Sequence, residues 1–126
     1  MDKIRGIVTK GMGEGAYFMS MPHYKKELKN ALGFESYPGT LNIKTSQDWR
    51  SLLSSKNSIE IEGFEKEGKK FGGVKCYLAK ILDIDGAIII PHYNKHKDDI
   101  VEFIAKDHVK TKTEIKDGDE VELWPN

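Results

Sequence analysis

Hydrophobic and polar residues alternate along several short stretches of this chain. The alternation is clearest in residues 40–44 and 59–62, where every second side chain is apolar. A period of two is typical of a β-strand with one buried face, whereas the three isoleucines at residues 88–90 indicate a strand buried on both faces. Together with β-branched and aromatic content, this pattern predicts eight strands, at residues 4–9, 16–19, 40–44, 59–62, 71–82, 86–91, 100–105 and 120–124.

One stretch has instead the period of an amphipathic helix. Tyr24, Leu28 and Leu32 recur at spacings that place them on one helical face, and lysines occupy the other face. Pro22 suits the first turn of such a helix, and Gly33 suits the left-handed residue that ends it. A second helix over residues 47–53 is only weakly patterned.

Eight strands and one clear helix in 126 residues predict a mainly β fold. A small closed β-barrel with the helix across one end is favoured, because closure leaves no exposed sheet edge. A two-sheet sandwich is the alternative, since the sequence does not set the order of the strands. The length fits a single domain over residues 1–126.

The charges are balanced, with 20 lysines and arginines against 20 aspartates and glutamates. A binder of nucleic acid or of an anionic membrane relies on an excess of basic residues, so neither partner is expected. No apolar run approaches the roughly 18 residues that span a bilayer, and the N-terminus lacks the apolar stretch of a signal peptide. Cys76 is the only cysteine, which excludes an intrachain disulfide and favours the reducing cytoplasm. We expect Cys76 to pack in the core.

Residues 11–15 read Gly-Met-Gly-Glu-Gly, with a glycine at every second position. Because no side chains stand in the way at these glycines, the backbone N–H groups of such a loop can converge on a phosphate. The stretch is neither a Walker A motif nor the Gly-x-Gly-x-x-Gly of dinucleotide-binding folds. A wide β-turn is the alternative interpretation.

Three polar residues on predicted strands are candidates for chemistry. Thr40 and Asn42 point to the same side of their strand, where a hydroxyl and an amide oxygen can hold Mg²⁺ together with substrate phosphates. Glu102 lies between Val101 and Phe103, and in a pocket its carboxylate could orient or deprotonate a hydroxyl. The alternatives are ordinary solvent-facing positions on the two strands. The four histidines show no spacing that indicates a zinc site.

Six stretches of the chain are informative together, namely GMGEGAYF at 11–18, PHYK at 22–25, LGFESYPGTLN at 32–42, FGGVK at 71–75, DGAIIIP at 85–91 and KDGD at 116–119. Taken in order, these stretches resemble the archaeal CTP-dependent riboflavin kinase family over essentially the whole chain. The pairing of the glycine loop with Gly-Thr-Leu-Asn at this distance is specific, although neither motif is specific alone.

The resemblance implies a cradle-loop β-barrel that transfers the γ-phosphate of CTP to the ribityl 5′-hydroxyl of riboflavin, giving FMN and CDP. By position, Thr40 and Asn42 would coordinate Mg²⁺, and Asn94 and Glu102 would contact the flavin. Glu102 is also the candidate catalytic residue. The implied nucleotide contacts come from two stretches, with Gly11, Met12, Gly13, Glu14, Gly15 and Ala16 in the first and Asp107, His108, Val109 and Lys110 in the second.

Three departures from the family pattern bear on this site. Ala16 stands where relatives commonly have a basic residue, Asn94 stands where threonine is familiar, and only Lys110 keeps the expected basic character in the second stretch. The departures at Ala16 and in the second stretch keep a rival hypothesis open, namely a barrel that binds flavin or nucleotide without turning it over. A DNA-binding barrel of the swapped-hairpin kind is a second rival, which the balanced charge disfavours. We expect a monomer, and no winged-helix domain of the kind that some relatives carry before the barrel.

Overall fold

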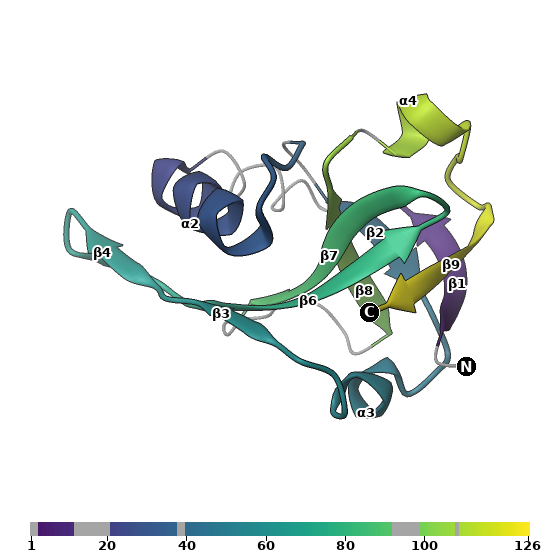
Figure 1. The fold of residues 1–126 in the computed structure, drawn as a ribbon, viewed down its shortest axis with the longest axis horizontal. Helices are drawn as coiled ribbons and strands as arrows, with labels where there is room; N and C mark the ends of the chain where they lie inside the picture. The colour runs from purple at the N-terminus through teal and green to yellow at the C-terminus, as the bar shows by residue number, and fades with distance from the viewer. Residues whose placement is uncertain (1–2, 12–20, 38–39, 92–98, 108) are drawn as a thin grey trace.

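The computed structural model describes residues 3–11, 21–37, 40–91, 99–107 and 109–126, and it confirms a mainly β fold (Figure 1). The elements of the described residues are β1 (Ile4–Thr9), α2 (Pro22–Leu32), β2 (Leu41–Lys44), α3 (Trp49–Leu53), β3 (Ile59–Ile61), β4 (Phe64–Lys66), β5 (Lys69–Phe71), β6 (Val74–Ile81), β7 (Ile84–Pro91), β8 (Ile100–Ala105), α4 (Val109–Thr113) and β9 (Glu120–Pro125). The strand predicted at residues 16–19 lies outside the described residues.

The strands β6, β7, β8, β2, β1 and β9 close into a barrel. The hydrogen-bonded order is β3-β6-β7-β8-β2-β1-β9, and β9 pairs in addition with β6. The strands β3 and β9 therefore share one edge of β6. Its first half pairs with β3, where Ile59 faces Cys76, and its second half pairs with β9, where Leu123 faces Ile81. This closure confirms the predicted barrel and excludes the sandwich.

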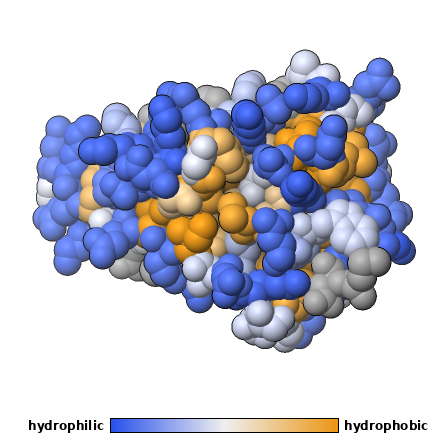
Figure 2. Space-filling model, in the orientation of Figure 1, coloured by the Kyte–Doolittle hydropathy of each residue, from blue (hydrophilic) through white to orange (hydrophobic). Residues whose placement is uncertain are grey.

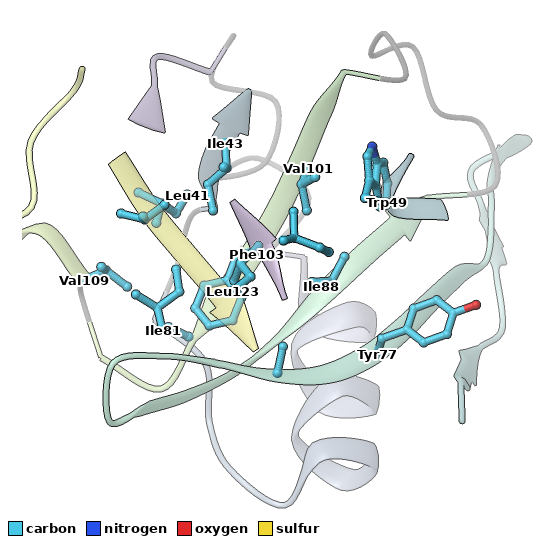
Figure 3. Packing of buried hydrophobic residues seen from close by; sticks show 14 of the residues in the cluster. Leu41, Ile43, Trp49, Tyr77, Ile81, Ile88, Val101, Phe103, Val109 and Leu123 are labelled. Carbon is cyan, nitrogen blue, oxygen red and sulfur yellow. The ribbon is translucent and has the colours of Figure 1, made fainter. Parts of the chain in front are cut away.

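The main apolar core fills the barrel. Phe103 on β8 faces Leu41 on β2 and Ile88 on β7, and none of these side chains is more than 7% exposed. Figure 3 shows Phe103 between the strands, with Val109 to one side and Trp49 to the other. These two side chains come from α4 and α3, which lie on opposite sides of the barrel in Figure 1. The short helices therefore complete the core that the strands enclose.

A second apolar cluster lies outside the barrel, beneath α2. Tyr24 and Leu28 of the helix pack there against outward-facing residues of β6, β7 and β8, which include Cys76 and Ile104. Gly33 ends the helix as predicted, in the left-handed conformation with a φ of 81°. The helix lies against the side of the barrel and not across one end as predicted, because its apolar face covers these outward apolar residues. On the face shown in Figure 2, hydrophilic side chains surround the apolar surface beside α2.

The strand predicted at residues 71–82 is divided in two. β5 ends at Phe71 and β6 begins at Val74, and the β4–β5 hairpin projects away from the barrel (Figure 1). The phenol of Tyr24 donates a hydrogen bond to the carbonyl of Gly72 at 2.7 Å, and the rings of Phe64 and Phe71 stack with centroids 4.8 Å apart. A side chain of α2 thus holds the glycine pair that interrupts the strand. Period-two alternation cannot reveal such a contact.

The weakly patterned second helix is confirmed as α3, which begins after Asp48. The Asp48 side chain accepts a hydrogen bond from the backbone N–H of Ser51 at 3.3 Å. The helix α4 is not among the predicted elements, because five residues with Val109 as the buried one show no apolar repeat. Its last residue, Thr113, donates from its hydroxyl to the carbonyl of Val109 at 2.6 Å. No helix in the described part of the chain has the length and apolarity needed to cross a membrane.

Cys76 is expected to be inert in the folded protein. Its side chain is fully buried beneath α2, and this burial, with the Glu60 carboxylate nearby, raises the pKa of the thiol from 9.0 to about 12. At pH 8 the thiolate population is then about a thousandfold lower than that of an unperturbed thiol. Labelling with a thiol reagent at pH 8 is expected to be negligible over an hour and complete once urea unfolds the chain. Rapid labelling without urea would contradict this expectation.

Candidate functional site

Asn42 and Glu102 face each other across the ladder formed by β2 and β8. Their chain neighbours Leu41 and Val101 point into the barrel, so Asn42 and Glu102 point out of it. Directly opposed residues of an antiparallel pair share one face, with Cβ atoms about 4.5–5.5 Å apart. Each of the two residues is nonetheless only 6% exposed. The alternative interpretation as solvent-facing positions is therefore wrong for this pair.

The glycine loop begins against Asn42. Thr9, the last residue of β1, pairs with Asn42 in the β1–β2 ladder, and Gly11 follows two residues later. A β-carbon added to Gly11 would lie 2.2 Å from Nδ2 of Asn42, so any larger residue has to displace this amide. The start of the loop, Asn42 and Glu102 are therefore neighbours. Three candidate segments that are far apart in the sequence meet at one place on the outer face of the barrel.

Asn42 also offers an oxygen for a ligand. Its Oδ1 is buried and accepts no hydrogen bond from the described residues. Leaving a carbonyl oxygen in that state costs about 1–3 kcal/mol, which a bound cation would offset. Thr40, half-buried, lies two residues earlier and directly precedes β2. The two neutral oxygens fit Mg²⁺, which keeps water or phosphate as its other ligands. Among the described residues, no group of three or more His, Cys, Asp or Glu could hold a metal ion.

Residues at both ends of the second predicted nucleotide stretch form ion pairs. The ammonium of Lys110 lies 2.5 Å from a carboxylate oxygen of Asp117, and Asp107 pairs with Lys112 at 3.1 Å. Between them, Val109 is buried in the barrel core with 4% exposure. A nucleotide contact of Val109 would therefore come from its backbone. Of the predicted site residues, Met12, Gly13, Glu14, Gly15, Ala16, Asn94 and His108 lie outside the described residues.

The turn at residues 116–119 connects this second stretch to the glycine loop. The N–H of Gly118 donates to the carbonyl of Val8 at 2.8 Å, and the N–H of Val8 donates to the carbonyl of Asp119 at 2.9 Å. In the sequence, the stretch at residues 116–119 was one of those that carry the family resemblance, and no role in the site was expected for Asp117. The bonds to Val8 place the same turn beside the end of β1, where the glycine loop begins. Asp117 is thus a residue near the site that sequence reasoning missed.

Comparison with known families decides what kind of domain this is. Residues 8–124 match the family model CTP-dep_RFKase, described as a domain of unknown function, DUF120. The chain belongs to this family. Riboflavin kinases of Pyrobaculum calidifontis and Archaeoglobus fulgidus are 41% and 40% identical to it, over 96% of this chain and 58% and 53% of their own length. The riboflavin kinase of Ignicoccus hospitalis is 36% identical, over 95% of this chain and 69% of that relative. The chain thus spans a little over half the length of the first two relatives.

In this CTP-dep_RFKase domain, the candidate site borders the apolar cluster beneath α2. Ile89 on β7 faces Glu102 on β8 and belongs to that cluster. The Glu102 carboxylate therefore has the polar Asn42 on one side and an apolar residue on the other. Such a border suits a ligand that combines an apolar ring system with a hydroxylated chain.

Proposed function

We propose that this chain is a riboflavin kinase that transfers the γ-phosphate of CTP to the ribityl 5′-hydroxyl of riboflavin, giving FMN and CDP. The observation that carries the proposal is the meeting of Gly11, Asn42 and Glu102 on the outer face of the barrel. The names of relatives 36–41% identical to the chain support riboflavin as the acceptor. The name of the family model, CTP-dep_RFKase, supports CTP as the donor.

In this reaction a bond forms between the ribityl oxygen and the γ-phosphorus, and the bond from that phosphorus to the β–γ bridging oxygen breaks. Positioning and neutralisation of charge supply most of the catalysis of such a transfer. Backbone N–H groups of the loop that begins at Gly11 are proposed to hold the donor phosphates. Mg²⁺ held by Thr40 and Asn42 would supply positive charge to these phosphates.

Glu102 is proposed to receive or orient the proton of the attacking hydroxyl. Because it faces Asn42 directly, a hydroxyl bound by its carboxylate lies next to the residue proposed to hold the metal. The protein around it excludes most water, since Glu102 is only 6% exposed. A carboxylate in such surroundings holds a neutral hydroxyl strongly.

A donor panel tests the proposed function. The protein is incubated with riboflavin, Mg²⁺ and each of CTP, ATP, GTP and UTP, and FMN is separated and quantified by its fluorescence. We expect FMN with CTP at a rate at least about tenfold above the other donors, since one lost hydrogen bond to the base costs that much. Equal rates with all four donors would contradict CTP as the specific donor. Binding of riboflavin or CTP with no FMN from any donor would favour the non-catalytic barrel.

A further inference from the structure

The ion pair between Lys110 and Asp117 joins two segments that flank the candidate site. Lys110 belongs to α4, next to Val109 in the barrel core, and Asp117 belongs to the turn before β9. The two side chains are 38% and 35% exposed, so solvent and a dissolved ligand can reach both groups. The ammonium has three N–H donors, of which the carboxylate needs one. Among the described residues, Asp117 is the partner of this ammonium, so two donors are left for another anion.

The turn that carries Asp117 is itself well held. The backbone N–H of Lys116 donates to Oδ2 of Asp119 at 2.8 Å, and the N–H of Asp119 donates to the carbonyl of Lys116 at 3.0 Å. Gly118 has a φ of 93°, which favours glycine. Because Gly118 and Asp119 bond to both polar backbone groups of Val8, the turn continues the β1–β9 ladder. The position of Asp117 is thus set relative to β1.

The glycine loop begins between two polar groups. Gly11 lies three residues after Val8, and three residues span at most about 11 Å. On the edge of β1 that pairs with β2, Gly11 packs against Asn42. On the opposite edge, which pairs with β9, lies the turn of Asp117 with Lys110 bound to it. A chain of phosphates held at the start of this loop therefore has Asn42 on one side and the Lys110 ammonium on the other.

We propose that Asp117 is a positioning residue, which holds the Lys110 ammonium toward the phosphates of a bound nucleoside triphosphate. The inference rests on the proposed function for the identity of the ligand. A free lysine side chain has many rotamers, and fixing one of them on binding weakens affinity. The ion pair with Asp117 selects one orientation before the nucleotide arrives. Asp117 need not touch the nucleotide, so its effect passes through Lys110.

The ion pair contributes little to folding, which makes the inference testable. Exposed ion pairs of this kind hardly change stability. Lys110→Ala and Asp117→Ala are therefore expected to unfold within a few degrees of the wild type. A matched control exists near the other end of β1, where Lys3 and Glu122 form an ion pair at 2.8 Å with similar exposure. Glu122→Gln removes a similar charge and is expected to leave nucleotide binding unchanged.

The test is a double-mutant cycle on CTP binding, measured by calorimetry without riboflavin and then by the KM for CTP. Lys110→Ala is expected to weaken binding about tenfold or more, because charge-assisted hydrogen bonds to phosphate are lost. Asp117→Ala is expected to weaken it about threefold to fivefold, from the loss of preorganisation. The double variant should bind no worse than Lys110→Ala, and the KM for riboflavin should not move. Asp117→Asn, which can still accept a hydrogen bond, should recover part of the loss.

Unchanged or tighter CTP binding by Asp117→Ala overturns the inference. The Asp117 carboxylate would then have no effect on CTP binding, or it would compete with the phosphates for the Lys110 ammonium. Full additivity in the double variant also overturns it, because Asp117 would act independently of Lys110. Wild-type protein that binds no CTP overturns the inference and the proposed function together. If the wild type makes FMN and Asp117→Ala binds CTP as tightly as the wild type, only this inference fails. If the wild type makes no FMN but the binding cycle holds, only the proposed kinase activity fails.

Discussion

Replacing Glu102 with glutamine is expected to lower kcat for FMN formation by about 10²–10⁴-fold while the KM for riboflavin changes little. A positioned general base contributes a factor of this size. The amide keeps the shape of the carboxylate and one acceptor oxygen, but it cannot take the proton. The residue is buried, and it faces Asn42 on the side where the donor phosphates are proposed to lie. Steady-state kinetics with riboflavin varied at saturating CTP and Mg²⁺ separate the two constants.

The matched control for this variant is Glu122→Gln on β9. Glu122 also lies on a strand of the barrel, but its side chain is 36% exposed and pairs with Lys3 and Arg5 at the surface. Its replacement should leave both kinetic constants near those of the wild type. A Glu102→Gln variant with normal kcat and a raised KM would instead make Glu102 an anchor for the flavin. Circular dichroism of both variants checks that the barrel is intact.

Replacing both Thr40 and Asn42 with alanine is expected to reduce Mg²⁺-dependent activity by at least about a hundredfold, since metal-ion catalysis contributes several kcal/mol. The barrel should stay folded, because neither residue belongs to the apolar core and Oδ1 of Asn42 accepts no hydrogen bond from the described residues. Activity is measured over a Mg²⁺ titration. A second readout is the rise in melting temperature that Mg²⁺ and CTP together produce, which the double variant should lose.

Lys44→Ala is the control for this double variant. Lys44 is the next outward position of β2 after Asn42, and its exposed ammonium lies 3.9 Å from Asp99. Its removal changes the charge of the same strand face without touching the proposed ligands, so the Mg²⁺ requirement should persist. Full activity with an unaltered Mg²⁺ requirement in the Thr40 and Asn42 double variant would exclude these residues as the metal site.

The sequence alone predicted those features whose signals are local. Alternation marked the strand with Asn42, apolar content marked the strand with Glu102, and the period of the apolar residues with Gly33 marked α2. Features that involve a contact with a distant residue gave no clear signal in the sequence. At the break before Val74, Gly72 accepts a hydrogen bond from Tyr24, and α4 places Val109 in the barrel core. Both contacts are made with groups that are distant along the chain.

In the candidate site, too, the sequence predicted some features and the tertiary structure decided others. The residue types of the glycine loop, Asn42 and Glu102 were apparent from the sequence, and the order of their segments indicated the family. That Asn42 and Glu102 oppose each other, and that both are buried, follows only from the pairing of β2 with β8. The ion pair of Lys110 with Asp117 likewise exists only because α4 and the turn before β9 meet. Periodicity specifies which face a residue occupies, but strand order and register specify its neighbours, and these arise from closure of the barrel.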